Sequence, residues 1–298
     1  MKKILITGGS GLVGSRLTEI LIEKGYNVAH LGRKAGEKKG VKTYKWDYKK
    51  EYIDIEAFAD ADCVVNLAGA NVSEGRWTES RKKELYDSRV QSTRLLYETI
   101  EKNNIPIKKV ISASAVGYYN STSDLMTEDK PAGKVFLAKV CADWEAEAQR
   151  FDSIHIPLCI FRIGIVLSPK GGFAAEMAKP IKLGFGAVLG NGKQQISWVH
   201  IDDLCAMFLK SIENIDMVGV YNAVSPESAS NKEITTAIAN HLGKPIWLPN
   251  VPAFALKLLF GGFSYELLVN HNISARKIVN SGLEFKYPDL ETTLNNVL

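Results

Sequence analysis

Three glycines near the start of the chain have the spacing of a phosphate-binding turn. Gly8, Gly11 and Gly14 follow a short apolar run and precede an amphipathic pattern in "KILITGGSGLVGSRL". The first glycine allows a tight turn, the second lets the backbone approach a pyrophosphate, and the third lets strand and helix pack closely. The N–H groups and the dipole of a helix N-terminus favour phosphate charge. We therefore expect a bound dinucleotide; a tight turn without a ligand is the alternative. The expected contacts are Thr7, Gly8, Gly11, Leu12, Val13 and Gly14.

The second predicted strand ends in a basic pair and not in an acid. An NAD site would place an Asp or a Glu on the adenosine ribose about 20 residues after the glycine loop. The sequence "NVAHLGRKAG" offers Arg33 and Lys34 instead. A guanidinium matches a 2′-phosphate by charge and stacks on adenine. We expect NADP(H) as the cofactor; a solvated basic turn is the alternative.

Short β-branched runs alternate with longer helical patterns. The predicted strands are Ile4–Thr7, Asn27–Leu31, Cys63–Leu67, Lys109–Ala113 and, with its exit, Ile154–Leu167. The predicted helices are Leu12–Lys24, Thr78–Asn103 and Lys134–Arg150. Because the strand runs are apolar throughout, they fit a parallel sheet covered on both faces. With right-handed crossovers, this predicts an α/β fold: a doubly wound parallel sheet of the Rossmann type.

The pattern loosens after the last of these strands. Glycine- and serine-rich loops such as "LGFGAVLGNGK" separate shorter elements, which is typical of a smaller lobe over the end of a sheet. We expect residues 1–165 to form the dinucleotide-binding domain, with later contributions from about 195–225, and residues 166–298 to form a smaller C-terminal substrate lobe. The apolar stretch Val251–Phe263 is predicted to be a packed helix, with a protein-contact surface as the alternative.

Composition and charge argue against several classes of protein. The 298 residues carry 37 basic and 33 acidic side chains, spread along the chain, so no nucleic-acid arm is expected. No apolar stretch approaches the roughly 20 residues of a membrane span. The four cysteines lie far apart without a C-x-x-C pair, which disfavours a metal site. Since the first residues also lack a signal-peptide core, we expect a cytoplasmic protein whose ligand is a small molecule.

Several separated motifs resemble the extended, or atypical, short-chain dehydrogenase/reductase superfamily, which includes NAD-dependent epimerases and dehydratases. "TGGSGLVG" resembles its glycine loop, "CVVNLAGA" its fourth-strand cofactor wall and "ISASAVGYY" its serine-bearing fifth strand. "LGNGKQQISWVHIDDL" and "FKYPDLETTL" resemble the uncharacterised epimerase-like branch that ends in a domain of unknown function. The resemblance implies NADP binding and adds Asp47, Leu67, Ala68 and Gly69 to the expected cofactor contacts.

The chain departs from the superfamily where the acid/base pair should lie. The superfamily has Tyr-x-x-x-Lys there, with the tyrosine as acid/base and the lysine lowering its pKa. This chain has Phe136 and Leu137 near the tyrosine position, and Val140 and Cys141 near the lysine position. The usual proton relay is therefore missing.

Hydroxyl groups on and after the fifth strand are the candidate replacements. Ser114 can bind a substrate oxygen, and Tyr118 or Tyr119 can supply a phenol at the edge of the sheet where ligands bind. The alternative is that both tyrosines only cap the loop. Glu128, in the loop before the next helix, is either a base or a solvated acid.

Arginines and an aromatic gather in "GRWTESRKKELYDSR", which contains Arg76, Trp77, Arg81 and Arg89. The last two arginines are about two helical turns apart, so they share roughly one face of the predicted helix. Such a cluster suits a carboxylate or phosphate substrate, whereas a charged helix surface is the alternative. His200, in "SWVHIDDL", is a further candidate for substrate binding, with a buried structural histidine as the alternative.

Two functions remain open on these observations. The first is an NADP-dependent epimerase-like or oxidoreductase enzyme with a nonstandard acid/base group, acting on an unidentified small molecule. The second is a non-catalytic NADP(H)-binding sensor or regulatory protein. The resemblance also implies a homodimer through the helix predicted at Thr78–Asn103.

Overall fold

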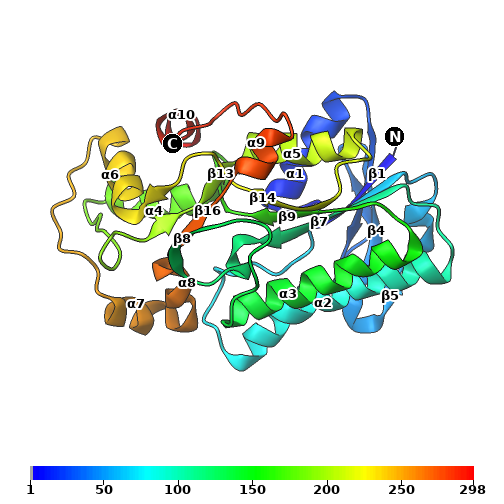
Figure 1. Cartoon of the computed structure of the whole chain (residues 1–298), viewed down its shortest axis with the longest axis horizontal. Helices are drawn as coiled ribbons and strands as arrows, with labels where there is room; N and C mark the ends of the chain where they lie inside the picture. The colour runs from blue at the N-terminus through cyan, green and yellow to red at the C-terminus, as the bar shows by residue number, and fades with distance from the viewer. Residues whose placement is uncertain (1–2) are drawn as a thin grey trace.

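A mostly parallel β-sheet forms the centre of the computed structural model, which describes residues 3–298. Its strand order is β14-β9-β7-β6-β1-β2-β4-β3, with β5 paired to β4 (Figure 1). Only β3 and β5, at one edge, run antiparallel to their neighbour β4. The strands are β1 (Lys3–Thr7), β2 (Asn27–Gly32), β3 (Gly36–Lys38), β4 (Val41–Asp47), β5 (Tyr52–Ile53), β6 (Cys63–Asn66), β7 (Lys109–Ala115), β9 (Leu158–Ile163) and β14 (Gly219–Ala223). The predicted α/β fold with a Rossmann-type sheet is confirmed.

Helices cover both faces of this sheet. Successive side chains of a strand point to opposite faces, so Ile4 and Ile6 pack under α1, α5 and α9, while Leu5 packs under α2 and α3. Figure 1 shows α2 and α3 side by side below the sheet, with the other three helices above it. Their bounds are α1 (Leu12–Glu23), α2 (Glu79–Lys102), α3 (Phe136–Gln149), α5 (Ile201–Glu213) and α9 (Arg276–Asn280).

The sequence did not predict the strands between residues 36 and 53. In the stretch Ile154–Leu167, which was predicted as a strand with its exit, the strand is β9, which ends at Ile163, and the exit forms β10 (Ile165–Ser168) of another sheet. Gly164 separates them, and a Cβ there would lie 2.7 Å from the carbonyl oxygen of Ser197. Short 3-10 helices complete this part: η1 (Tyr48–Lys50), η2 (Ile55–Phe58), η3 (Val116–Tyr118) and η4 (Arg150–Ile154).

A smaller lobe with its own core lies at one end of the sheet. Leu167, Trp198 and Ile238 are buried at its centre. Its helices are α4 (Phe173–Lys182), α6 (Asn231–His241) and α10 (Leu290–Val297), and its short strands are β10, β11 (Gly171–Gly172), β12 (Gln195–Ile196), β13 (Trp198–His200) and β15 (Ala229–Ser230). Between β13 and β15 the chain returns to the main sheet, where it forms α5 and β14.

The apolar helix α7 (Ala253–Phe260) is exposed, so the expectation of a packed helix was wrong. Leu256 is its buried residue, while Phe254, Leu258 and Leu259 are 76%, 74% and 65% exposed. Its hydrophobic residues lie all round the helix axis, and only one side meets the protein. Among residues 3–298, no helix combines the length and apolar character needed to cross a membrane.

The chain comes back to the main domain after α7. It passes through η5 (Gly261–Phe263) and α8 (Ser264–Leu268) to β16 (His271–Ile273). β16 pairs in parallel with β8 (Thr122–Met126), which belongs to the segment between β7 and α3. The lobe therefore supplies α8 to the region where β7 ends and α3 begins (Figure 1).

Candidate functional site

The glycine loop between β1 and α1 is packed so closely that two of its glycines have no room for a side chain. Gly8 has a φ of +68°, and a Cβ there would lie 2.8 Å from the Leu67 carbonyl oxygen. A Cβ on Gly14 would lie 2.4 Å from the Gly8 carbonyl oxygen. Gly9, which the motif leaves free, is also confined, because its Cβ would meet the His30 ring at 2.4 Å. These contacts fix the loop tightly against the end of β1.

Gly11 differs, because it is exposed and less confined than Gly8 and Gly14. A Cβ there would meet only the Gly8 carbonyl oxygen, at 3.2 Å. Gly11 is the N-cap residue of α1, where no side chain caps the helix and no acid lies in the first turn. The Gly11 N–H donates a 3.0 Å bond to the Gly8 carbonyl oxygen, so the N–H groups that no side chain caps are those of the first turn of α1, where the helix dipole favours an anion. This geometry fits the pyrophosphate of a dinucleotide. Leu12 and Val13 form the half-buried start of the helix.

Thr7 ties the ends of β1 and β6 together. Its hydroxyl donates a 2.7 Å hydrogen bond to Asn66 Oδ1 and accepts bonds from the N–H groups of Leu67 and Ala68, both at 3.0 Å. The Thr7 side chain is fully buried and its hydroxyl already has three partners, so Thr7 supports the loop after β6 and offers no surface to a ligand. Gly69, the last residue of the expected cofactor wall, is exposed.

Arg33 and Lys34 follow β2 directly, at the carboxyl end of the sheet. Both side chains are exposed, and neither forms a hydrogen bond or an ion pair with another residue in the described range 3–298. Asp47 ends β4 nearby, and its carboxylate accepts a 3.0 Å bond from the Lys49 N–H as the cap of η1. The two cations are therefore free to meet an anion, whereas Asp47 already has a partner on the protein.

Arg81 and Arg89 hold the loop that follows β6. The Arg89 guanidinium donates to the carbonyl oxygens of Leu85 and Ala70, each at 3.0 Å, and lies over the Trp144 ring. Burial lowers the pKa of Arg89. Arg81 donates to the Asn71 carbonyl oxygen at 2.5 Å. The two arginines thus donate hydrogen bonds to neighbouring loop residues, Asn71 and Ala70, which agrees with their predicted place on one face of the helix. Both guanidinium groups already have hydrogen-bond partners within the protein.

Arg76 and Trp77 connect this loop to the C-terminal lobe. The Trp77 ring centroid is 5.5 Å from that of Phe136, at the start of α3, and 5.8 Å from that of Phe263 in η5. Arg76 donates a 3.4 Å bond to the Leu258 carbonyl oxygen of α7. The loop after β6, the start of α3 and the lobe therefore meet around one tryptophan.

Ser114, at the carboxyl end of β7, belongs to a buried ion-pair network. Its hydroxyl donates a 2.6 Å bond to Glu145 Oε1 on α3. Arg162 on β9 binds the same carboxylate with two bonds of 2.8 Å, one to each oxygen. All three side chains are buried. The pair is bidentate, which is the favourable geometry for a guanidinium and a carboxylate.

Tyr119 extends this network into the core and has no hydroxyl free for a substrate. It is 1% exposed, donates a 2.7 Å bond to Asn222 Oδ1 and accepts a 2.8 Å bond from Arg162. Burial raises the pKa of Tyr119 to about 12.

The Glu128 carboxylate also has a partner, since it accepts a 2.9 Å hydrogen bond from the Asn222 N–H. Tyr118 is half-buried under the Arg162 guanidinium, 3.5 Å from its ring centroid, and its hydroxyl binds no residue in the described range 3–298.

The helix α3 presents no tyrosine and lysine pair. Phe136 packs on Trp77, and a Cβ on Gly117 would lie 3.6 Å from the Leu137 side chain. Cys141 is 3% exposed, close to the backbone of Ala115 at the end of β7, and burial raises the pKa of its thiol to about 12. At neutral pH this thiol is protonated, so it neither replaces a lysine cation nor acts as a thiolate.

A half-buried carboxyl group of the lobe was not singled out in the sequence. Burial raises the pKa of Glu266 on α8 to about 7. It is the lone acid between Glu233 and Glu284.

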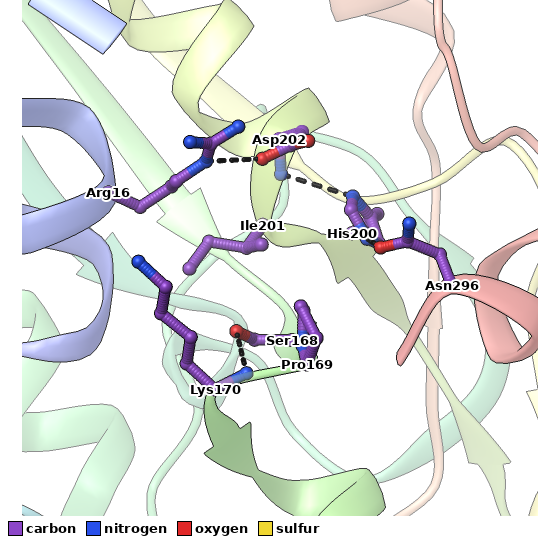
Figure 2. Close-up of a pocket in the computed structure, with 8 residues that line it drawn as sticks. All are labelled: Arg16, Ser168, Pro169, Lys170, His200, Ile201, Asp202 and Asn296. Carbon is purple, nitrogen blue, oxygen red and sulfur yellow. Dashed lines mark hydrogen bonds and ion pairs between the residues drawn. The ribbon is translucent and has the colours of Figure 1, made fainter. Parts of the chain in front are cut away.

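His200 lies elsewhere, at the start of α5. Its Nδ1 accepts a 3.1 Å bond from the Asp202 N–H, so the histidine caps α5, and its Nε2 is 3.0 Å from Asn296 Oδ1 on α10. Burial lowers its pKa. Figure 2 shows it on the wall of a cavity of about 260 Å³ that also contains Arg16 and Lys170. None of the eight lining residues comes from β7, α3 or the loop after β6, so His200 is not brought together with the other candidates.

Known proteins are similar to this chain over nearly its whole length. The family described as NAD dependent epimerase/dehydratase family matches residues 4–224, and a domain of unknown function, DUF1731, matches residues 251–297. The epimerase family protein YfhF of Bacillus subtilis is 32% identical over 299 residues, which cover 99% of this chain and 97% of YfhF.

Solved structures are also similar to this chain over nearly its whole length. The human epimerase family protein SDR39U1, solved with NADPH, is 30% identical with a TM-score of 0.87, covering 99% of this chain and 98% of the human one. A Thermus thermophilus UDP-glucose 4-epimerase, solved with NAD, has a TM-score of 0.77 at 20% identity, covering 99% and 97% of the two chains, and so shares the fold.

Proposed function

Because the chain belongs to the NAD dependent epimerase/dehydratase family, we propose that it is an NADP(H)-dependent enzyme of the epimerase or oxidoreductase type. The observation that carries this proposal is the open N-terminus of α1 at Gly11, where no side chain caps the N–H groups of the first turn. When bound, the nicotinamide supplies or accepts a hydride at a carbon of the substrate. The substrate is a small molecule.

Preference for NADP(H) over NAD(H) is supported by the end of β2. Arg33 and Lys34 are exposed and unpaired within the described part of the chain, and no acid follows β2 directly in the sequence to bind a ribose hydroxyl. A 2′-phosphate would give both cations a partner. The human relative solved with NADPH points the same way.

The substrate side of the site is proposed to lie between the loop after β6 and the lobe. Arg76 and Arg89 place positive charge there and Trp77 supplies an aromatic surface, whereas Arg81 is already paired with Glu84 at 2.6 Å. This charge favours a substrate with a carboxylate or phosphate group. Of the three hydroxyl groups near the end of β7, the Tyr118 hydroxyl is the one without a protein partner in the described range 3–298.

A non-catalytic NADP(H) sensor is the second candidate, and one observation favours it. The tyrosine and lysine pair is replaced by apolar and neutral groups, and the hydroxyls of Ser114 and Tyr119 are already bonded inside the protein. A cytoplasmic location and a homodimer through α2 remain predictions.

Turnover separates the two candidates. We would incubate the full chain with NADPH, or with NADP⁺, and a panel of sugar nucleotides, small acids, aldehydes and ketones, and follow nicotinamide absorbance. The enzyme proposal requires substrate-dependent change with at least one class of compound. Tight NADPH binding with no turnover across the panel would favour the sensor.

A further inference from the structure

Large apolar side chains are exposed on two segments of the lobe, residues 183–185 and 247–259. Six of them are each between 65% and 76% exposed, whereas no other large apolar side chain among residues 3–298 exceeds 47%. Single exposed apolar residues are common on protein surfaces, but a group of them marks a site that contacts a protein or a membrane. The six are Leu183, Phe185, Trp247, Phe254, Leu258 and Leu259, and we call them the outer apolar surface.

Hydrogen bonds join the two segments that carry the outer apolar surface. The Trp247 indole N–H donates a 3.1 Å bond to the Gly184 carbonyl oxygen. The Val251 N–H donates a 2.8 Å bond to the Val188 carbonyl oxygen, and the next residue, Pro252, is the N-cap of α7. Figure 1 shows the chain after α6 running along the outer end of the lobe to α7. The six side chains therefore occupy the same end of the lobe.

Positive charge surrounds these apolar side chains. The chain has no Asp or Glu between residues 177 and 201 or between residues 234 and 265, but it has five lysines there. Lys179 is paired with Glu176. The other four are exposed, and their ammonium groups form no ion pair or hydrogen bond with any residue in the described range 3–298: Lys182, Lys193, Lys244 and Lys257. The outer apolar surface is therefore bordered by unpaired cations.

A cavity of about 360 Å³ lies beside Trp247 and has the same character. Ile246 and Leu248, the two neighbours of Trp247 in the chain, line it, and so do Lys232 and Lys244. None of its ten lining residues is an acid. Lysine ammonium groups bind phosphate well, so the cavity can take a phosphate group next to the exposed tryptophan.

These charges favour an anionic membrane over a protein as the occupant. A second copy bound across a twofold axis would bring the same surface against itself, so unpaired lysines would meet lysines and no acid. Lysine is also depleted in protein–protein interfaces. At a membrane surface, by contrast, leucine and phenylalanine enter the boundary of the acyl chains, tryptophan lies at the headgroups, and lysine reaches anionic phosphates.

We propose that the outer apolar surface binds the surface of an anionic membrane. The side chains of α7 and Trp247 enter the interface, while the unpaired lysines and the cavity beside Trp247 bind headgroup phosphates. Because α7 has eight residues, it lies on the bilayer and does not span it. This contact uses no residue of the glycine loop, so it does not depend on the proposed enzyme function.

The test is co-sedimentation of the full chain with lipid vesicles. One set of vesicles is phosphatidylcholine alone, and the other contains equal parts of phosphatidylcholine and phosphatidylglycerol. The apolar variant is Leu258→Ala with Leu259→Ala, and its control is Ile22→Ala with Ile55→Ala, two exposed side chains of the main domain. Thermal melting shows that each variant is folded.

A second pair of variants tests charge at a constant change in net charge. Lys244→Glu lies in the cavity, and its control Lys38→Glu lies on the edge strand β3, outside the lobe. Bromine-labelled lipid gives an independent readout, because bromine quenches tryptophan fluorescence at the membrane. Trp46, Trp144 and Trp198 are buried, so quenching should disappear in Trp247→Phe.

We expect the wild type to bind the anionic vesicles and to bind neutral phosphatidylcholine much more weakly. The double leucine variant should lower the partition coefficient roughly tenfold or more, because six carbon atoms are removed from the interface. Lys244→Glu should lower it roughly tenfold, since each cation near an anionic surface gives about a fivefold gain and an anion reverses it. Both controls should bind like the wild type.

Other outcomes overturn the proposal in distinguishable ways. Absence of wild-type binding to anionic vesicles would refute it. Equal vesicle binding by the double leucine variant and its control would show that a different surface meets the membrane. Absence of vesicle binding together with a lipid-free dimer that the double leucine variant dissociates, in sedimentation equilibrium, would assign the surface to a second copy. NADPH titration of the same variants should be unchanged in every case.

Discussion

Replacing Gly11 with alanine should weaken cofactor binding and leave the fold intact, whereas Gly14→Ala should destabilise the fold. The two glycines belong to one loop but have different surroundings. A Cβ on Gly11 would meet only the Gly8 carbonyl oxygen at 3.2 Å, and the backbone of Gly11, with φ −75° and ψ 176°, suits any residue. A Cβ on Gly14 would lie 2.4 Å from that oxygen and 2.7 Å from Gly9 Cα.

The expected magnitudes follow from these contacts. A methyl group on Gly11 enters the opening in front of α1, and loss of one charge-assisted hydrogen bond to the pyrophosphate costs about 1.5–3 kcal/mol. That loss raises the Kd for NADPH roughly ten- to hundredfold. In Gly14→Ala, backbone must move to relieve the overlap, and overpacking of this kind costs about 1–3 kcal/mol of stability. A chain of this size loses roughly 2–4 °C in Tm per kcal/mol.

Calorimetric titration with NADPH and thermal melting, both on the full chain, measure the two effects. Gly11→Ala should lower Tm by about 2–4 °C, because alanine is a poorer N-cap than glycine by roughly 1 kcal/mol, and Gly14→Ala should lower it further. Wild-type NADPH affinity in Gly11→Ala would refute the assignment of this loop to the pyrophosphate. Unchanged melting of Gly14→Ala would refute the packing argument.

Three further predictions test other parts of the molecule. Arg33→Ala should weaken NADPH binding at least tenfold and NADH binding much less, because only NADPH carries the 2′-phosphate; equal losses in a titration would exclude that contact. On α7, Leu256→Ala should lower the free energy of unfolding by about 2–5 kcal/mol, because this side chain is buried. Leu258→Ala, at a side chain that is 74% exposed, should leave the free energy of unfolding nearly unchanged. Equal effects of the two variants in denaturant unfolding would contradict the observed burial. Burial lowers the pKa of His271 to about 4, below its ordinary value of about 6.5. The folded protein therefore favours the neutral imidazole, and the free energy of unfolding decreases as the pH falls from about 6.5 toward 4. His271→Gln should reduce this pH dependence, and a variant with the same dependence as the wild type would refute the linkage.

The fold was predictable where a strand is buried on both faces. β1 and β6 are built around short continuous apolar runs, Ile4–Ile6 and Cys63–Val65, which a reader of the sequence sees directly. β4 is different, because it lies near the edge of the sheet and buries only Val41 and Trp46 among polar residues. Its place depends on pairing with β2, a contact that leaves no clear pattern in the sequence. The exposure of α7 was unpredictable for a similar reason, since apolar composition alone does not say which faces meet the protein.

The candidate site was predictable only where it is local. The glycine loop is one continuous segment, so its residues, their spacing and their function are read together. The network around Ser114 takes Glu145 from α3 and Arg162 from β9, and these partners cannot be assigned before the strand order is known. The sequence therefore indicated two hydroxyl groups that the fold has already engaged, those of Ser114 and Tyr119, and one, that of Tyr118, which binds no residue in the described range 3–298.

The most direct test of the account is calorimetric titration of the full chain with NADPH and, on the same preparation, with NADH. The account predicts saturable binding of one NADPH per chain, at least tenfold tighter than the binding of NADH. The reason is that Arg33 and Lys34 can bind the 2′-phosphate, and no acid follows β2 directly to bind a ribose hydroxyl. Equal affinity for the two nucleotides would contradict the NADP(H) preference. Absence of binding to both would contradict the central claim that the open end of α1 is a dinucleotide site.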